Sequence, residues 1–269
     1  MKPYSRLSRL FALAILVTAF VPILGCPTQD QGQQALLNRV DALEDGLAAV
    51  QSELGSAMAD LATVQGALAE AQTKLAHMSI EEGALNGLNG PHLIIEGCNI
   101  HVRSGSGDTE DAEGLTGLGN LIIGYNELPD PVVHGRLGSH NLVLGSFHEY
   151  SSWGGLVAGY HNAVTGRFSS ASGGSFNLAS GDGSSASGGQ NNEASGGISS
   201  VSGGYYNVAS GGASSISGGG CNEASVWVSS VSGGGYNVAS GTASSVSGGD
   251  HRSATENANW AAGSLFEEY

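Results

Sequence analysis

Two groups of side chains have the chemistry to bind a cation. The first is a set of closely spaced histidines, whose ring nitrogens are common metal ligands: His134, His140, His148 and His161. If three chains met on one axis, each histidine could form a threefold ring. The second is an acidic loop whose oxygens suit Ca²⁺: Asp108, Glu110, Asp111 and Glu113. We favour exposed or space-filling histidines and a solvated loop, and therefore predict no metal and no cofactor.

Serine is the most obvious candidate nucleophile, yet its pattern argues against catalysis. The serines recur at fixed positions of a repeat, and no nucleophile elbow or catalytic constellation accompanies them, so we expect a protein that is not an enzyme. The chain carries 24 acidic residues against 9 lysines and arginines. Phosphate contacts need clustered cations, and nucleic acid is therefore not an expected partner.

The N-terminus indicates export. A basic start precedes an apolar run from Leu10 to Leu24, which is shorter than the about 20 residues of a membrane span and typical of a secretory signal. The run ends in Ile23-Leu24-Gly25-Cys26, which resembles the bacterial lipobox. That resemblance implies cleavage after residue 25 and lipidation of Cys26. The alternative is an ordinary signal or membrane anchor with an incidental cysteine.

Residues 35–79 carry an unbroken heptad pattern, which predicts a coiled coil. Leucine dominates one core position and valine recurs at the other, a distribution that favours more than two strands over a parallel dimer. A helical hairpin turning at Gly55 is the alternative, but the heptad phase runs through that glycine. The residues expected to hold the chains together are Val40, Leu43, Leu47, Val50, Leu54, Leu61, Val64, Leu68 and Leu75, with Met78 as the last core position.

From residue 155 onward the period is 15, which indicates a parallel β-solenoid with two short strands per coil. We number the positions from lines that begin at Gly155, Ser170 and every fifteenth residue thereafter. Position 2 is apolar, beginning with Leu156, position 5 is glycine, and position 10 is Val164 and then alanine. Disorder, the alternative for a Gly/Ser-rich segment, does not require such fixed columns. Position 8 predicts a stacked asparagine ladder: Asn162, Asn177, Asn192, Asn207, Asn222 and Asn237.

Positions 6 and 7 vary between lines, so we expect them to face outward rather than to build the coil. Exposed aromatic side chains on a rigid scaffold are typical of binding surfaces, although the same rings could pack between chains. The candidate ligand surface consists of Tyr160, Phe176, Tyr205, Tyr206 and Tyr236. Four further aromatic or apolar side chains end the chain, either as a cap over the last coil or as a binding tip: Trp260, Leu265, Phe266 and Tyr269.

The repeat "SSVSGGYYNVASGGA" (200–214) resembles the head repeats of trimeric autotransporter adhesins. "NLVLGSFHEYSSWG" (141–154) is similar to a 14-residue variant coil, and "NLIIGYNE" (120–127) to another. The resemblance implies a left-handed parallel β-roll in which three chains share a core. In that family, however, the head precedes the stalk and a C-terminal barrel anchors the protein. The resemblance therefore extends to a stalked trimer and not to self-secretion.

These features predict a mixed, elongated protein: a parallel trimeric coiled coil followed by an all-β solenoid head. The expected segments are a signal peptide (1–25), lipidated cysteine and linker (26–34), stalk (35–79), β-rich connector (80–140), head (141–259) and cap (260–269). Cys98 and Cys221 could pair in an exported chain, but two buried thiols are the simpler reading.

The expected function is adhesion or surface interaction in the bacterial cell envelope. The chain would form a homotrimer, anchored by lipid to what we expect to be the outer membrane. Its head would bind a glycan or protein of a host or neighbouring cell. The alternative is a structural envelope spacer that has no specific ligand.

Overall fold

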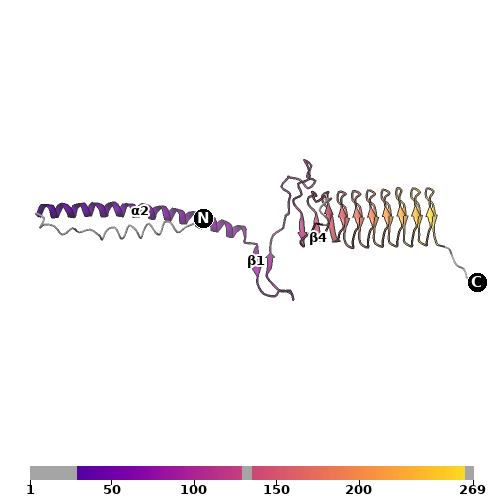
Figure 1. Ribbon diagram of the computed structural model, residues 1–269, viewed down its shortest axis with the longest axis horizontal. Coiled ribbons are helices and arrows are strands. Elements are labelled where there is room, and N and C mark those ends of the chain that lie inside the picture. Colours follow the sequence, from indigo (N-terminus) through magenta and orange to yellow (C-terminus); the bar gives the residue numbers. More distant parts are fainter. Residues whose placement is uncertain (1–28, 129–134, 264–269) are drawn as a thin grey trace, which may run out of the picture. The chain divides into compact units, whose positions relative to one another are not determined.

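The computed structural model describes residues 29–128 and 135–263. The chain divides between Cys98 and Asn99 into two compact units. The first contains one long helix and a hairpin, and the second contains a β-solenoid (Figure 1). The expected signal peptide (1–25), Cys26, His134 and the last aromatic residues, Phe266 and Tyr269, lie outside the described residues.

The heptad segment is a single helix, α2, from Gln29 to Lys74. It begins within the segment expected to be a linker. Its last turn contains Lys74, which favours a helix C-terminus and pairs with Glu70 at 2.6 Å. The apolar side chains of the heptad are exposed, for example Leu43 at 63% and Leu61 at 56%. Among the described residues, none of the helices is both long and apolar enough to span a membrane.

The heptad pattern overestimates the length of the helix at its C-terminal end. Leu75 still donates its N–H to the Ala71 carbonyl at 3.0 Å, but Met78 begins strand β1 (Met78–Glu81). That strand pairs antiparallel with β2 (His92–Ile95), with Met78 opposite Ile95. Met78 therefore does not occupy a coiled-coil core position, because its backbone has left the helix for a hairpin.

The second unit confirms the predicted parallel solenoid. Its strands alternate between a ten-stranded sheet and an eight-stranded sheet, both parallel, so that each coil adds one strand to each (Figure 1). The ten-stranded sheet consists of β3 (Leu121–Ile123), β4 (Leu142–Ser146), β6 (Leu156–Tyr160), β8 (Ser170–Ala171), β10 (Ser185–Ala186), β12 (Ser200–Val201), β14 (Ser215–Ile216), β16 (Ser230–Val231), β18 (Ser245–Val246) and β20 (Trp260–Ala261). The other consists of β5 (Glu149–Tyr150), β7 (Ala163–Val164), β9 (Leu178–Ala179), β11 (Glu193–Ala194), β13 (Val208–Ala209), β15 (Glu223–Ala224), β17 (Val238–Ala239) and β19 (Ser253–Ala254).

The strand pairing extends the solenoid beyond both ends of the predicted head. Strand β3 pairs in parallel with β4, so the connector already contributes a strand to the ten-stranded sheet. At the other end, Trp260 pairs with Ser245 at the same 15-residue offset as the preceding coil. Trp260 is thus part of the last described strand, whereas the rest of the expected cap lies outside the described residues beyond Gly263.

One line of the repeat was aligned wrongly from the sequence. Val157, not Leu156, pairs with Ala171 and is fully buried, while Leu156 pairs with Ser170. The coil from Leu156 to Ser169 therefore has 14 residues, like the preceding coil, in which Leu142 pairs with Leu156. Continuous strand β6 replaces the extra glycine turn of later coils, a difference that a fixed count of 15 cannot detect.

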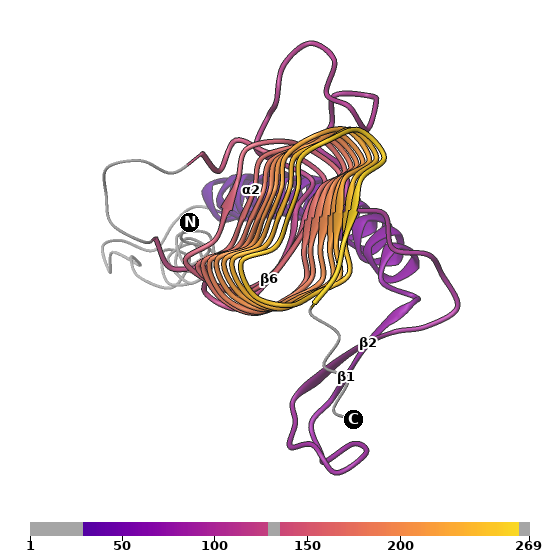
Figure 2. The same ribbon diagram turned by 90° about the vertical axis from the view of Figure 1, so that its right-hand side faces the viewer.

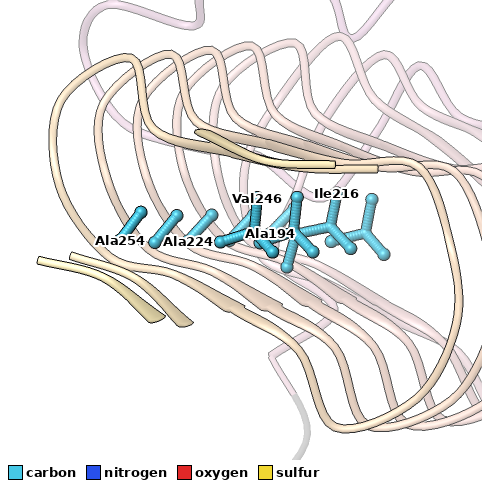
Figure 3. Close-up of a cluster of buried hydrophobic side chains, with 9 residues drawn as sticks. Ala194, Ile216, Ala224, Val246 and Ala254 are labelled. Atoms are coloured by element: carbon cyan, nitrogen blue, oxygen red, sulfur yellow. The ribbon is translucent and has the colours of Figure 1, made fainter. Parts of the chain in front are cut away.

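The core is a narrow column of small apolar side chains that one chain closes by itself. Positions 2 and 10 meet inside the coil, where Val201, Ala209 and Ala224 are fully buried. The end-on view shows the two strand sets facing each other across this interior (Figure 2). Figure 3 shows Ala194, Ile216 and Val246 among the buried side chains between them. Positions 2 and 10 are therefore buried by the stacked coils of one chain, and this part of the core needs no partner chain.

The glycine at position 5 is required by both conformation and space. Gly204 has a φ of +86°, and a Cβ there would lie 2.0 Å from the Gly219 carbonyl oxygen of the next coil. The same approach recurs at Gly174 and Gly189, also 2.0 Å from the carbonyl oxygen one coil on. Only a residue without Cβ permits this close stacking of backbones.

We predict that Gly204→Ala destabilises the solenoid by about 1–3 kcal/mol, because the new methyl group must displace a backbone carbonyl at a positive φ. The neighbouring Gly203→Ala is the control, since nothing lies within 4 Å of a Cβ at that position. It should change stability by less than about 1 kcal/mol. Urea unfolding followed by circular dichroism measures both, and equal effects would contradict the steric argument.

Candidate binding surface on the aromatic edge of the solenoid

The asparagine column holds one turn of every coil to the next. The Asn207 N–H donates to Asn192 Oδ1 at 3.1 Å, and Asn207 Nδ2 donates to the carbonyls of Gly203 and Gly219, both at 3.0 Å. The ladder thus links side-chain amides to backbone groups of three coils. These bonds provide hydrogen-bond partners for side-chain amides that are almost completely buried. The same arrangement recurs along the column: Asn162, Asn177, Asn192, Asn207, Asn222 and Asn237.

His148 occupies the ladder position in the 14-residue coil before Asn162. It is completely buried. Its Nδ1 accepts the Asn162 N–H at 3.2 Å, which leaves Nε2–H to donate to the Leu144 carbonyl at 2.9 Å. This pattern requires neutral imidazole, and burial lowers the pKa of His148 below its ordinary value. His148 is therefore a structural substitute for asparagine.

The ladder turn displays position 7 in the left-handed conformation. Phe176, Tyr206 and Tyr236 have φ values of 56°, 52° and 54°, although none is glycine. In each case the N–H of position 7 donates to the position 6 carbonyl of the previous coil, for example Tyr206 to Gln190 at 3.1 Å. The hydrogen bond to the previous coil offsets the energetic cost of this uncommon backbone conformation. The conformation directs these side chains away from the core.

We call positions 6 and 7, with their equivalents in the 14-residue coils, the aromatic edge. All five aromatic residues of the predicted ligand surface lie on it and are exposed, from 43% at Phe176 to 58% at Tyr206. Three further aromatic rings lie on the same edge: Phe147, His161 and His251.

Ring contacts fix much of this edge. Phe147 and Phe176 both contact the Tyr160 ring edge-on, with centroids 5.4 and 5.8 Å away. Farther along, Tyr205 and Tyr206 meet edge-on at 6.3 Å. Tyr236 stacks on His251 at 4.9 Å. Such contacts reduce the rotamer freedom that binding would otherwise remove.

Gly220 and Cys221 lie next to tyrosines of neighbouring coils. A Cβ at Gly220 would lie 2.3 Å from the ring of Tyr205, so this ring lies directly over the Gly220 backbone. The Cys221 thiol, with a smaller contribution from Tyr205, raises the pKa of Tyr236 above its usual value. Tyr236 therefore remains a neutral phenol, able to donate a hydrogen bond, at physiological pH.

The opposite edge, at positions 13 and 14, has a different composition. It carries exposed Ile198 and Trp227 and an ion pair between Arg167 and Asp182 of adjacent coils. The Arg167 Nε–Asp182 Oδ2 distance is 2.9 Å. The pair is more than half exposed and therefore contributes little to stability. This edge offers exposed side chains in the same coils for comparison with the aromatic edge.

The acidic loop is not uniformly solvated. Asp111 is buried and accepts hydrogen bonds from Ser104 Oγ at 2.6 Å, from Ser106 Oγ, and from Thr116 N–H and Oγ1 at 3.2 and 2.8 Å. The hydroxyl of Ser104, then those of Ser106 and Ser139, hold the pKa of Asp111 far below its usual range. This carboxylate organises the loop, and its oxygens are occupied by protein donors.

The other candidate metal ligands are not brought together. His140 is bound within the loop, with Nε2 accepting the Ser104 N–H at 3.0 Å, whereas His161 packs against Phe176 on the aromatic edge. Within residues 29–128 and 135–263, no group of three metal-binding side chains is present. Cys98 and Cys221 are free thiols. Cys98 is exposed and Cys221 half-buried, so the expectation of two buried cysteines is wrong.

No family model matches the sequence, and no curated protein matches it significantly. The assignment of the fold therefore depends on the sequence repeat and on the register of strand pairing. The similarity to autotransporter heads is supported only as far as a parallel solenoid with 15-residue spacing.

Sequence reasoning missed Phe147, His251 and the structural roles of His148 and Asp111. His251 was recognisable, because it precedes position 8 of its line. Phe147 and His148 became recognisable only when the deletion in the 14-residue coil was located through its strand register. Asp111 accepts hydrogen bonds from Thr116, which also contacts the distant Ser139 Oγ, and no local pattern reports that arrangement.

We predict that the wild-type protein loses stability as the pH falls below about 6.5, because His148 must remain neutral in the fold but gains a proton when unfolded. His148→Asn should remove this part of the pH dependence, since asparagine fits the same ladder. The control is His161→Asn, at a half-buried position outside the ladder where Asn191 already adopts a similar φ in another coil. Thermal unfolding between pH 5 and 8 measures the effect. An unchanged pH profile in His148→Asn would contradict it.

Proposed function

We propose that the protein is a non-enzymatic, lipid-anchored homotrimer of the bacterial cell envelope that carries its solenoid on a coiled-coil stalk and uses it for adhesion. The outer membrane is the proposed location, and Cys26 is the proposed lipidation site. The aromatic edge is the proposed contact surface, with a glycan or protein of another surface as its partner.

The observation that carries this proposal is the contrast between the two units. The solenoid buries its own core at positions 2 and 10, whereas helix α2 exposes its apolar heptad residues, including Leu47 at 58% and Leu54 at 58%. An apolar stripe with heptad spacing is typically covered by other helices. Self-association through α2 would therefore use none of the residues of the aromatic edge, which belong to the other unit.

Adhesion is tested by adding the soluble chain from residue 27 to 269 to target cells and by shaving intact producing cells with protease. Binding that depends on the aromatic edge, together with protease-accessible solenoid, would support the proposal. Absence of binding combined with envelope defects on deletion would instead support a structural spacer. Cys26→Ser tests the anchor separately. The variant should be released from membranes, whereas the wild-type protein should remain bound to them.

We predict that the chain from residue 27 to 269 sediments as a trimer and that Leu61→Asp shifts it to monomer. The substitution adds one charge from each chain to the same buried layer of the coiled coil, where an unpaired charge is strongly unfavourable. Analytical ultracentrifugation measures the mass of both proteins.

The matched control is Ala59→Asp, which adds the same charge to α2 outside the heptad core and should leave the mass unchanged. A monomeric wild-type protein would overturn the proposed trimer. Dissociation by both substitutions would show that the mass change does not depend on the heptad core.

A further inference from the structure

Aromatic residues occupy position 7 in every second coil of the central solenoid. Phe176, Tyr206 and Tyr236 are separated by intervals of 30 residues, with Asn191 and Cys221 at the same position in the coils between them. Consecutive coils pair in unbroken register along this edge, from Tyr160 through to Asp250. The three aromatic positions therefore recur at a spacing of two strands, about 9.6 Å.

The backbone presents these three side chains in the same way. The N–H of each donates to the carbonyl one coil back, at 3.2 Å for Phe176, 3.1 Å for Tyr206 and 3.0 Å for Tyr236. All three have left-handed φ values within a few degrees of one another. Because the coils cannot slide without breaking the asparagine ladder, the spacing of the three rings is built into a rigid edge.

From Phe176 to Tyr236, positions 6 and 7 carry no charged side chain, and the pair of Asp250 and His251 lies one coil beyond Tyr236. Gln190 and Asn191 lie in the coil between Phe176 and Tyr206, and amides can donate to and accept from hydroxyl groups. Tyr205 adds a phenol. The chain has a net charge of −15, which disfavours an anionic polymer through like-charge repulsion. A neutral ligand rich in hydroxyl groups and with apolar ring faces matches this surface.

We propose that the aromatic edge binds an extended, neutral β-1,4-linked polysaccharide, with sugar rings packed against Phe176, Tyr206 and Tyr236. In such a polymer, successive sugars face opposite ways, so the same sugar face recurs once per disaccharide. The length of one disaccharide is comparable to the spacing between aromatic rings two coils apart. The equal spacing favours a periodic ligand over a protein surface, which has no such repeat. The inference rests on the proposed adhesive function and names the ligand class of the same site.

The first experiment measures binding of the chain from residue 27 to 269 to insoluble cellulose and chitin, with granular starch as the α-linked control. We expect saturable binding to a β-1,4-linked polymer and none to starch. Tyr206→Ala should weaken binding by about threefold to tenfold, the loss of one aromatic contact. Trp227→Ala, which removes an exposed ring from the opposite edge, should leave binding unchanged.

The decisive variant keeps the composition and changes only the spacing. Asn191→Tyr combined with Tyr206→Asn moves the middle ring by one coil, and both residue types already occur at position 7 with positive φ. We expect this exchange to weaken binding as much as Tyr206→Ala, with an unchanged unfolding midpoint. Full binding by the exchanged variant, or equal binding to starch, would overturn the proposal.

The outcome is distinguishable from failure of the adhesive function. Adhesion to cells without binding to cellulose or chitin would overturn the polysaccharide proposal and leave adhesion intact. Binding to the polysaccharide without adhesion to cells would support the ligand class and remove the adhesive role.

Discussion

The close parallel stacking of coils is the constraint on which the rest of this solenoid depends. Backbone carbonyls such as that of Gly219 approach the preceding coil so tightly that a glycine must stand at position 5. The same spacing allows the Asn207 side-chain amide to donate hydrogen bonds to acceptors in three consecutive coils. A core of alanine and valine is sufficient because the two sheets are close together, and each coil adds the same contacts as the last.

Stacking also decides which side chains remain available for binding. Once the backbone hydrogen bonds hold positions 7 and 14 in the left-handed region, residues such as Tyr206 and Ile198 adopt φ values of 52° and 58°. Their side chains lie at the two edges, where sequence can change without altering the coil. The stacking of coils therefore explains both the rigid turn and its tolerance of different side chains. It also fixes the spacing between side chains of a binding surface on that edge.

Groups that suggest chemistry in the sequence act mainly in the fold. His148 replaces an asparagine of the ladder, and Asp111 accepts hydrogen bonds from serine and threonine hydroxyls within its loop.

The repeat predicted the solenoid, its two short strands and its glycine turns, because identical lines must occupy identical environments. The repeat located the 14-residue coil at 141–154 but not the one that follows it, since Leu156 and Val157 are both apolar and only strand pairing distinguishes the buried one.

By itself, the sequence determined the features that depend on periodicity: a heptad helix, a 15-residue coil, the asparagine column and the outward position of the variable aromatic residues. Tertiary structure alone decided the end of the helix at Lys74, the extension of the sheet from Leu121 to Ala261 and the closure of the core within one chain. The reason is physical. Periodicity reports the average environment of a column, whereas register, strand pairing and burial are set by contacts between coils that are distant or irregular in sequence.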